Sequence, residues 1–550
     1  MILYIQLLEI LSRFPLIGNI LVYLYDIMVN DPVHFIVEVL LVLLIVFLLL
    51  QKSYNPETRE KLTKKEEDEI IDSWQPQPLH NALSEQQQLD LSVIPTIDKV
   101  DGKFILFSGK QCVNFTSFNF LNMTSEPQVI ESAVKALDKY GCGSCGPRGF
   151  YGTLDIHLEF EKKLADFLGT EGSCVYSSQY TTATSVIPAF AQRQDLLVCD
   201  IGANHALKGG CSLARSQLFY FAHNDLEDLE RVLSDIIKKD RKTGRKITRR
   251  WIIVESIYTD SGFVLNLPEL VRIARQYFFR IMLDESNALG VMGKRGRGSW
   301  EHFGYEKPTD CADIIIGDLG RALAGSSGFC TGPINTVEHQ RLNGSGYVFS
   351  ASLPPFLNAS GIASLDLLSQ DASVVDELRE NCVYFRKALR KSSLLSSNGK
   401  DASHPPFVVR PDLSTEINDI SPIVHLTIEE PLTDVESAAH SNDTGAVQRT
   451  RLENEKYLQS IVDKAFQAGI ALTRAKYSEH RWDNKYSMPP PSLRIAMSAK
   501  ITKQDIDELI ETLQDIVSTL PYDKDESFQY ESTPITASGS STKAASSNDY

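Results

Sequence analysis

Residues 32–50 form the longest apolar run in the chain. Residues 35–50 contain one charge, Glu38, and residues 32–34 extend the run to a length close to the roughly 20 residues that span a bilayer. Asp31 followed by Pro32 is typical of a helix start. A buried core helix would carry a polar face, and a signal peptide would end in a small-residue cleavage site. The pattern therefore predicts a membrane-spanning helix over 32–50.

Between residues 91 and 375, short runs rich in Ile and Val alternate with segments of helical periodicity. The predicted strands lie in CVNFTSF, GSCVYSS, DLLVCDIG, WIIVESIY, FRIMLDES, DIIIGD and SGFCTG. The predicted helices cover 127–140, 155–169, 225–238, 266–277 and 356–395. Such alternation indicates an α/β domain with a mainly parallel sheet covered on both faces.

A smaller C-terminal α/β domain is predicted over 376–520. Its strands lie in PIVHLTI, IALTRA and LRIAMS, and its helices cover 453–468 and 503–519, with a loose polar insertion over 430–450. Residues 521–550 are rich in Ser, Thr and Asp, which predicts a disordered tail. The charged residues 51–90 are expected to form a stalk. Residues 1–31 are expected to form a luminal or interfacial amphipathic segment, because charges and breakers interrupt their apolar positions.

The charges that flank the apolar run predict its orientation. Arg13 is the only Lys or Arg before it, whereas five follow closely: Lys52, Arg59, Lys61, Lys64 and Lys65. Basic residues favour the cytosolic side of a membrane. We therefore expect a cytosolic body and an N-terminus outside or in a lumen.

The overall composition narrows the class of partners. The chain has 550 residues and a formal net charge of −16, which argues against nucleic acid as a partner. The nine cysteines are best interpreted as reduced thiols; Cys142 and Cys145 form a lone CxxC, which is weak evidence for a metal site, and none is predicted. The basic residues 238–250 are interpreted as a solvated surface loop, with contact to acidic lipid as the alternative.

Four local motifs carry a family resemblance over about residues 90–520. They are YGCGSCGPRGFYGTLDIHLEFEKKLADFLG (140–169), LDESNALGVMGKRGRG (283–298), VFSASLPP (348–355) and PSLRIAMSAKITKQDI (491–506). Together they resemble the α-oxoamine synthases, which are fold-type-I, aminotransferase-like enzymes that use pyridoxal phosphate (PLP). The resemblance implies a large PLP-transferase-like domain followed by a smaller one.

The resemblance also identifies the positions of a PLP site. Such a site needs a Schiff-base lysine, an anion facing the pyridine nitrogen, a stacked ring and phosphate donors. Arg321 falls on the lysine, and a guanidinium stays protonated and has no free amine lone pair. Asp284 falls on the anion, with the capping of a turn as its alternative role. Asn287 replaces a family His, and Asn204 replaces the stacking His unless a one-residue slip brings in His205. We expect a retired, vestigial site.

Within the family, the chain is most similar to a non-catalytic subunit found in a heterodimeric branch. That branch joins L-serine to palmitoyl-CoA at the endoplasmic reticulum membrane and gives 3-ketodihydrosphingosine, the first step of sphingolipid synthesis. The resemblance implies that a lysine-bearing paralogue binds PLP covalently, and that this chain completes the paralogue's active site. Small regulatory membrane proteins are expected as partners at the membrane helix.

By the same resemblance, several residues are expected to serve the partner's site. Cys145 lies on the glycine-rich turn with Gly146 and Arg148, Tyr176 falls at the partner's substrate cavity, and Ser350 reaches the cofactor phosphate. The alternatives are a small buried thiol at Cys145, a core tyrosine, and turn capping or a role for Ser352. Arg494 matches a carboxylate-binding arginine but in a retired site is interpreted as a structural partner.

Two other functions stay open from the sequence. One is a self-sufficient α-oxoamine synthase, against which Arg321 argues. The other is a membrane scaffold that has kept the fold without an interface role, against which the retained turn around Cys145 argues.

Overall fold

A computed structural model describes residues 23, 28–51, 62–74, 78–79, 81–92, 94, 96–244, 249–395, 407–428, 444–477 and 488–520. The chain divides into two units, Met1–Leu83 and Ser84–Tyr550. Most of the predicted amphipathic segment over 1–31, most of the polar insertion over 430–450 and the whole predicted tail over 521–550 lie outside the described residues.

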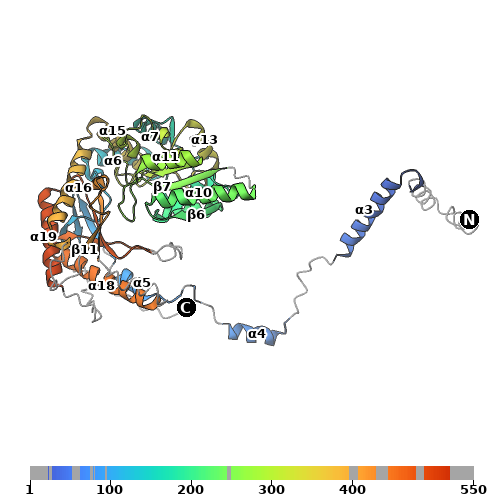
Figure 1. Ribbon diagram of the computed structural model, residues 1–550, viewed down its shortest axis with the longest axis horizontal. Coiled ribbons are helices and arrows are strands. Elements are labelled where there is room, and N and C mark those ends of the chain that lie inside the picture. Colours follow the sequence, from blue (N-terminus) through green and yellow to red (C-terminus); the bar gives the residue numbers. More distant parts are fainter. Residues whose placement is uncertain are drawn as a thin grey trace, which may run out of the picture. The chain divides into compact units, whose positions relative to one another are not determined.

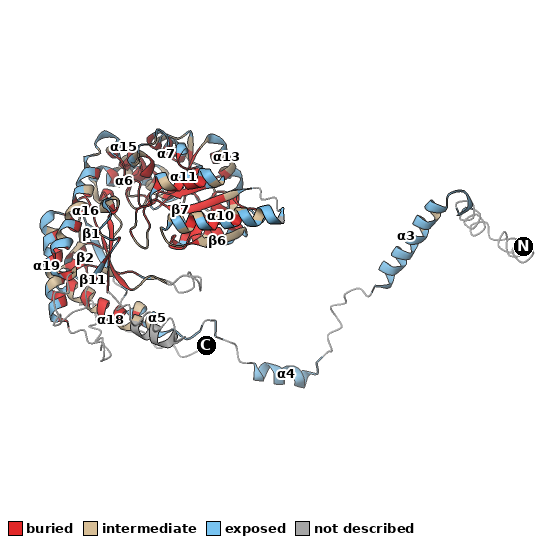
Figure 2. Ribbon diagram, viewed as in Figure 1, coloured by how far each residue is buried: buried red, intermediate tan, exposed pale blue. Residues whose placement is uncertain are grey.

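The first unit contains the predicted apolar helix, α3 (Pro32–Leu50). Asp31 caps it, because the Asp31 carboxylate accepts a hydrogen bond from the His34 backbone N–H at 3.1 Å. None of its residues is buried (Figure 2). Within the described ranges, α3 is the one helix long and apolar enough to span a membrane. A short polar helix follows, α4 (Lys64–Ser73), which begins with a capping box between Thr63 and Glu66.

A seven-stranded sheet forms the centre of the second unit. Its order is β4 (Gly172–Tyr176), β10 (Gly328–Gly332), β9 (Ile314–Asp318), β8 (Arg280–Asp284), β7 (Arg250–Glu255), β5 (Leu196–Asp200) and β6 (Gln217–Phe221). The five strands from β9 to β6 are parallel, and β10 is antiparallel to both of its neighbours. The prediction of a mainly parallel sheet is confirmed.

Alternate residues of these strands pack on opposite faces of the sheet, as the strand repeat requires. On β7 and β8, Ile252 and Leu283 join a cluster with residues of α7 (Asp155–Leu168), α10 (Leu226–Thr243), α11 (Leu267–Tyr277) and α15 (Pro355–Gln370). Ile253 and Met282 join the opposite cluster, with α8 (Gln179–Phe190) and α9 (His205–Ala214). Figure 1 shows α10 and α11 beside β6 and β7. The sheet is therefore covered on both faces, as predicted.

Six further helical elements belong to the part of the chain that forms the seven-stranded sheet. They are η2 (Met123–Ser125), α6 (Pro127–Tyr140), α12 (Ser299–His302), η3 (Pro308–Asp310), α13 (Ile334–Asn343) and α14 (Ser345–Phe349). The nine cysteines, all within the described ranges, are free thiols.

Two predicted helix boundaries were wrong. Residues 356–395 form two helices, α15 and α16 (Ser373–Lys391), because Asp371 is extended and its carboxylate accepts a hydrogen bond from the Ser373 N–H at 2.9 Å. Helix α10 continues to Thr243, so the first part of the predicted basic loop is helical. The helix ends only at Gly244, which has a φ of 62° and donates its N–H to the Asp240 oxygen.

The C-terminal part contains an antiparallel sheet in the order β11 (Phe407–Arg410), β12 (Ile423–Ile428), β15 (Ser492–Ala496) and β14 (Thr473–Arg474). It packs with α18 (Thr444–Gln467), α19 (Lys503–Thr519), η4 (Ser393–Leu395) and η5 (Glu416–Ile420). The predicted strand IALTRA is divided at Leu472. Its first half, β13 (Ile470–Ala471), instead joins β1 (Ile97–Asp101), β2 (Phe104–Phe107) and β3 (Lys110–Asn114).

The segment before β1 also packs with the C-terminal elements. Helix α5 (Glu85–Ser92) lies beside α18, with an ion pair of 2.9 Å between Glu85 and Lys456. Asp90 pairs with Arg474 of β14 at 2.8 Å. Elements from the start of the second unit, α5 and β1 to β3, therefore pack against its C-terminal elements.

Candidate functional site

Four parallel strands end in a carboxylate at the same edge of the large sheet. They are Asp200 on β5, Glu255 on β7, Asp284 on β8 and Asp318 on β9. The carboxyl ends of parallel strands are where open α/β sheets bind ligands. The candidate site is built on this edge.

Asp284 is buried and tightly hydrogen-bonded. Its carboxylate accepts hydrogen bonds from the Ser286 N–H at 2.8 Å, the Asn204 amide at 3.0 Å and the Gln179 amide at 3.1 Å. Burial raises the pKa of Asp284, while the Ser286 hydrogen bonds and the Arg321 charge act in the opposite direction. This side chain occupies the position predicted for the cofactor anion, but residues of the chain itself surround it.

Glu255 is a second buried carboxylate that the sequence interpretation missed. It pairs with Asp284 in the β7–β8 register and accepts hydrogen bonds from the Asn204 N–H at 2.7 Å and from Thr259. Burial, followed by the Asp284 charge, raises the pKa of Glu255 to about 8. Two adjacent buried carboxyl groups resist simultaneous ionisation, so the pair holds a proton near neutral pH. The sequence signal that could have identified Glu255 is its position at the end of the apolar strand β7.

Arg321 occupies the predicted lysine position, and its guanidinium is mostly buried, with 11% of the side chain exposed. It donates to Asp318 at 3.3 Å, to Thr259 at 3.2 Å and to the Gln179 side-chain oxygen at 3.3 Å. It also donates to the Asn287 side-chain oxygen. The guanidinium thus links four separate segments of the site.

Asn204, predicted to fall where a ring would stack on a cofactor, presents an amide to the site. Asn204 caps α9 and donates to Asp284, whereas His205 is exposed and its ring lies against Tyr180 at 5.5 Å. Of these two residues, only Asn204 faces the site. Phe118, which sequence analysis did not identify, packs against Arg321 at 5.1 Å and Arg494 at 4.5 Å.

Arg494 lies beside this cluster on β15. It donates to the Thr116 backbone oxygen at 3.2 Å. Burial lowers the pKa of Arg494, and the Arg321 charge adds to the effect. The described residues do not fit PLP, because Arg321, predicted to fall on the lysine, already bonds to its neighbours and Asn204 presents no ring.

The predicted interface residues Cys145 and Ser350 lie on two adjoining segments. Pro147 forms a bridge with Ala351, and the Ser352 N–H donates to the Gly146 oxygen at 2.9 Å. Cys145 is exposed and has a φ of 55°. Gly152 closes the turn, since a Cβ there would lie 1.9 Å from the Gly146 oxygen. Ser350 is half-buried, while Ser352 is buried and donates to the Gly152 oxygen at 2.7 Å.

Two further predicted interface residues, Arg148 and Tyr176, lie beneath this surface. Arg148 is buried and pairs with Glu161 of α7 at 2.8 Å. Tyr176 is buried at the end of β4 and donates to Gln340 of α13 at 2.5 Å. Both therefore support the exposed segments from within the chain.

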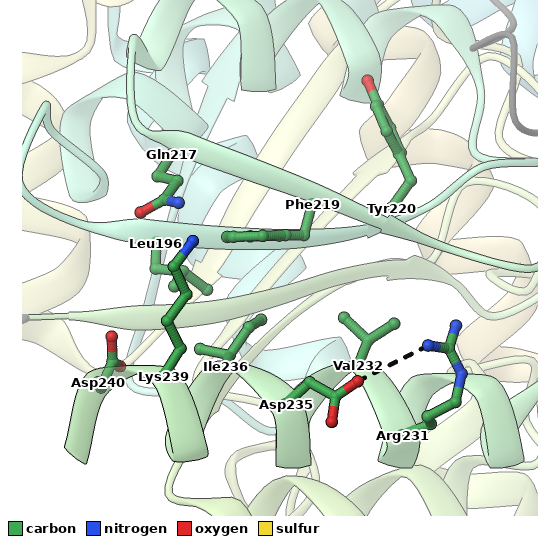
Figure 3. A pocket seen from close by; sticks show the side chains of 10 residues that line it. All are labelled: Leu196, Gln217, Phe219, Tyr220, Arg231, Val232, Asp235, Ile236, Lys239 and Asp240. Carbon is green, nitrogen blue, oxygen red and sulfur yellow. Dashed lines mark ion pairs between the residues drawn. The ribbon is translucent and has the colours of Figure 1, made fainter. Parts of the chain in front are cut away.

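The structure also contains a hollow away from the strand-end site. A pocket of about 380 Å³ lies between α10 and the edge strand β6, with Phe219, Val232 and Ile236 among its lining residues (Figure 3). Lys239 extends from α10 toward Gln217, and Arg231 pairs with Asp235.

Within the described parts of the chain, no cluster of His, Cys, Asp or Glu could hold a metal ion.

Comparison with known proteins identifies the class of this fold. Residues 110–513 match the family Aminotransferase class I and II. A serine palmitoyltransferase from S. paucimobilis, solved with a bound PLP–myriocin aldimine, superposes with a TM-score of 0.64 at 23% identity, over 78% of this chain and 95% of that one. The chain therefore has the fold-type-I PLP-transferase fold.

One relative over nearly the full length and one over about two thirds of the chain define the branch. Serine palmitoyltransferase 1 of Dictyostelium discoideum is 36% identical over 509 residues, which cover 92% of this chain and 98% of that protein. Long chain base biosynthesis protein 1b of Oryza sativa subsp. japonica is 44% identical over 356 residues, 65% of this chain and 72% of that protein. The chain belongs to the family of serine palmitoyltransferase subunit 1, also named long chain base biosynthesis protein 1.

Proposed function

We propose that this chain is the required, non-catalytic subunit of a heterodimeric serine palmitoyltransferase. The holoenzyme would condense L-serine with palmitoyl-CoA to 3-ketodihydrosphingosine, the first step of sphingolipid synthesis. One observation supports the proposal: Arg321, which the resemblance aligns with the Schiff-base lysine, is bonded to Gln179, Thr259, Asn287 and Asp318. A lysine-bearing paralogue would therefore hold PLP covalently and supply the electron sink for the reaction.

The contribution of this chain is the surface around the glycine-rich turn. Cys145, Gly146 and Ser350 would complete the partner's active site, supported by Arg148 and Tyr176. Three aromatic side chains near this turn are largely exposed, with 65% of Phe150, 95% of Tyr151 and 78% of Phe349 accessible. Exposed aromatic side chains of this size are typical of protein interfaces. This feature favours an interface role over a scaffold without one.

The chain would be anchored in the endoplasmic reticulum membrane by α3. Basic residues after the helix support a luminal N-terminus and a cytosolic body. Glu38, paired with His34 at 3.4 Å, would lie near the luminal end. Small regulatory membrane proteins would bind along α3, and the acyl-CoA would reach the partner from the cytosol.

The test is the visible spectrum of this chain purified with PLP, alone and then with its lysine-bearing partner. We expect Schiff-base absorbance and serine-dependent condensation only in the mixture. A Schiff base in the isolated chain would overturn the role given to Arg321. A fully active partner without this chain would refute the proposal that the subunit is required.

A further inference from the structure

Three segments far apart in the sequence carry the residues proposed to serve the partner. Cys145 lies on the turn after α6, Tyr176 ends β4, and Ser350 follows α13 and α14. A partner's active site can use these residues only if the segments keep a fixed relative geometry. A buried group that bonds to all three would set that geometry.

Glu161 of α7 is such a group. One carboxylate oxygen accepts from Arg148 of the turn at 2.8 Å and from the Val175 N–H of β4 at 3.0 Å. The other oxygen accepts from Arg341 of α13 at 3.2 Å. Each of the three segments is therefore tied to the same carboxylate.

The surroundings make this carboxylate hard to replace. Only 4% of the Glu161 side chain and 3% of the Arg148 side chain are exposed. The second terminal nitrogen of Arg148 is buried without a hydrogen-bond partner, although its guanidinium also lies over the Tyr347 ring at 5.1 Å. Removing one member of a buried ion pair leaves an uncompensated charge. Without the Glu161 charge, Arg148 would move toward water and take the turn with it.

A second set of contacts, through Arg148 and Tyr347, joins the same three segments. Arg148 holds its own turn through Thr153, to which its Nε donates at 3.1 Å. Tyr347 of α14 contacts both Arg148 and the Tyr176 ring, with 6.1 Å between the two ring centroids. Displacement of Arg148 would therefore change the packing of Tyr347 against Tyr176 and the position of α14, which leads to Ser350.

We propose that Glu161 is a positioning residue for the partner's active site, holding the Cys145 turn, the Tyr176 strand end and the Ser350 segment in register. This inference rests on the proposed function. Because the Cys145 turn and the Ser350 segment would complete the partner's active site, loss of the register should weaken serine binding as well as turnover.

The experiment compares the full-length heterodimer carrying Glu161→Gln with the wild type. Glu159→Gln is the matched control, since Glu159 lies on the same helix and is exposed. We expect the KM for serine to rise and kcat/KM to fall about tenfold, below the roughly hundredfold that a 1 Å misplacement can cost. The control should stay within about twofold of the wild type. A purely structural role would reduce the amount of active complex and leave KM unchanged.

A milder variant covers the case in which Glu161→Gln fails to fold. Arg341→Gln removes only one of the three ties, from a side chain that is 32% exposed. Its KM for serine should rise by about threefold, because one register contact is lost while the buried Arg148 pair stays intact. Wild-type KM values in every variant that assembles would overturn the inference. An inactive wild-type mixture would refute the proposed function itself, and the inference with it.

Discussion

Arg321→Ala tests whether the guanidinium holds the candidate site together. The substitution removes donors from Asp318, Thr259, Gln179 and Asn287 together. A hydrogen bond to a charged group contributes about 1.5–3 kcal/mol, and a buried acceptor left unsatisfied costs about 1–3 kcal/mol. Asn287 is 1% exposed, so water cannot easily replace the lost donor at its oxygen. Because water can reach part of the remaining space, we expect a net loss of about 3 kcal/mol rather than the sum of the contacts.

The assay is urea unfolding of the full-length chain in detergent, followed by tryptophan fluorescence. Trp251 and Trp300 are buried in the second unit and report on its unfolding. A loss of about 3 kcal/mol changes the folding equilibrium by roughly two powers of ten. Arg272→Ala is the control, since Arg272 is on the surface of α11, and it should unfold at the wild-type midpoint. If Arg321→Ala is as stable as this control, Arg321 does not hold the site together.

Three further predictions test other parts of the molecule. The raised pKa of Glu255, about 8 against an ordinary 4.5, means that the folded state keeps a proton that the unfolded state loses. Stability should therefore fall as the pH rises from about 5 to 8, and Glu255→Gln should flatten this slope in urea midpoints taken across the range. Cys145→Phe should leave the unfolding midpoint of the lone chain unchanged, because Cys145 is exposed, yet cripple condensation by the heterodimer or change its choice of amino acid; unchanged activity and product would reject an interface role. Leu43→Arg, near the middle of α3, should weaken membrane insertion by about 2.5–3.5 kcal/mol and release chain on carbonate extraction.

The elements that the sequence predicted well are those whose residues share one environment, such as strands buried on both faces of the sheet. The apolar runs in WIIVESIY and FRIMLDES became β7 and β8, whose residues are buried from both faces. Strand β6 was missed because it lies at the sheet edge and most of its residues are half-buried. Helix α8 was missed because it is packed on several sides, shows no clear polar face and contains Pro188.

The site was predicted in part for a related reason. Asp284 ends the apolar strand β8 and Arg321 lies in the glycine-rich loop after β9, where pattern and resemblance both identify them. Gln179 and Thr259 come from other connections in the chain and reach Arg321 only because the sheet order brings those connections together. The order of the strands in the sheet differs from their order along the chain, and a single sequence does not reveal it. The division into a large domain over 91–375 and a small one over 376–520 stays a prediction, although β3 pairs with β13 across it.

The contacts around Arg321 show that its neighbours form one hydrogen-bonded network. Gln179 accepts from Arg321 through its oxygen while its nitrogen donates to Asp284 and Ser286. Asn287 likewise accepts from Arg321 and donates to the Ile257 oxygen at 2.9 Å. An amide can do both at once, whereas a protonated histidine at 287 would offer a guanidinium only donors. Arg321→Lys alone would therefore leave Asp284 bonded to the amides of Gln179 and Asn204 and would place no ring at 204, so we expect no PLP binding from this single change.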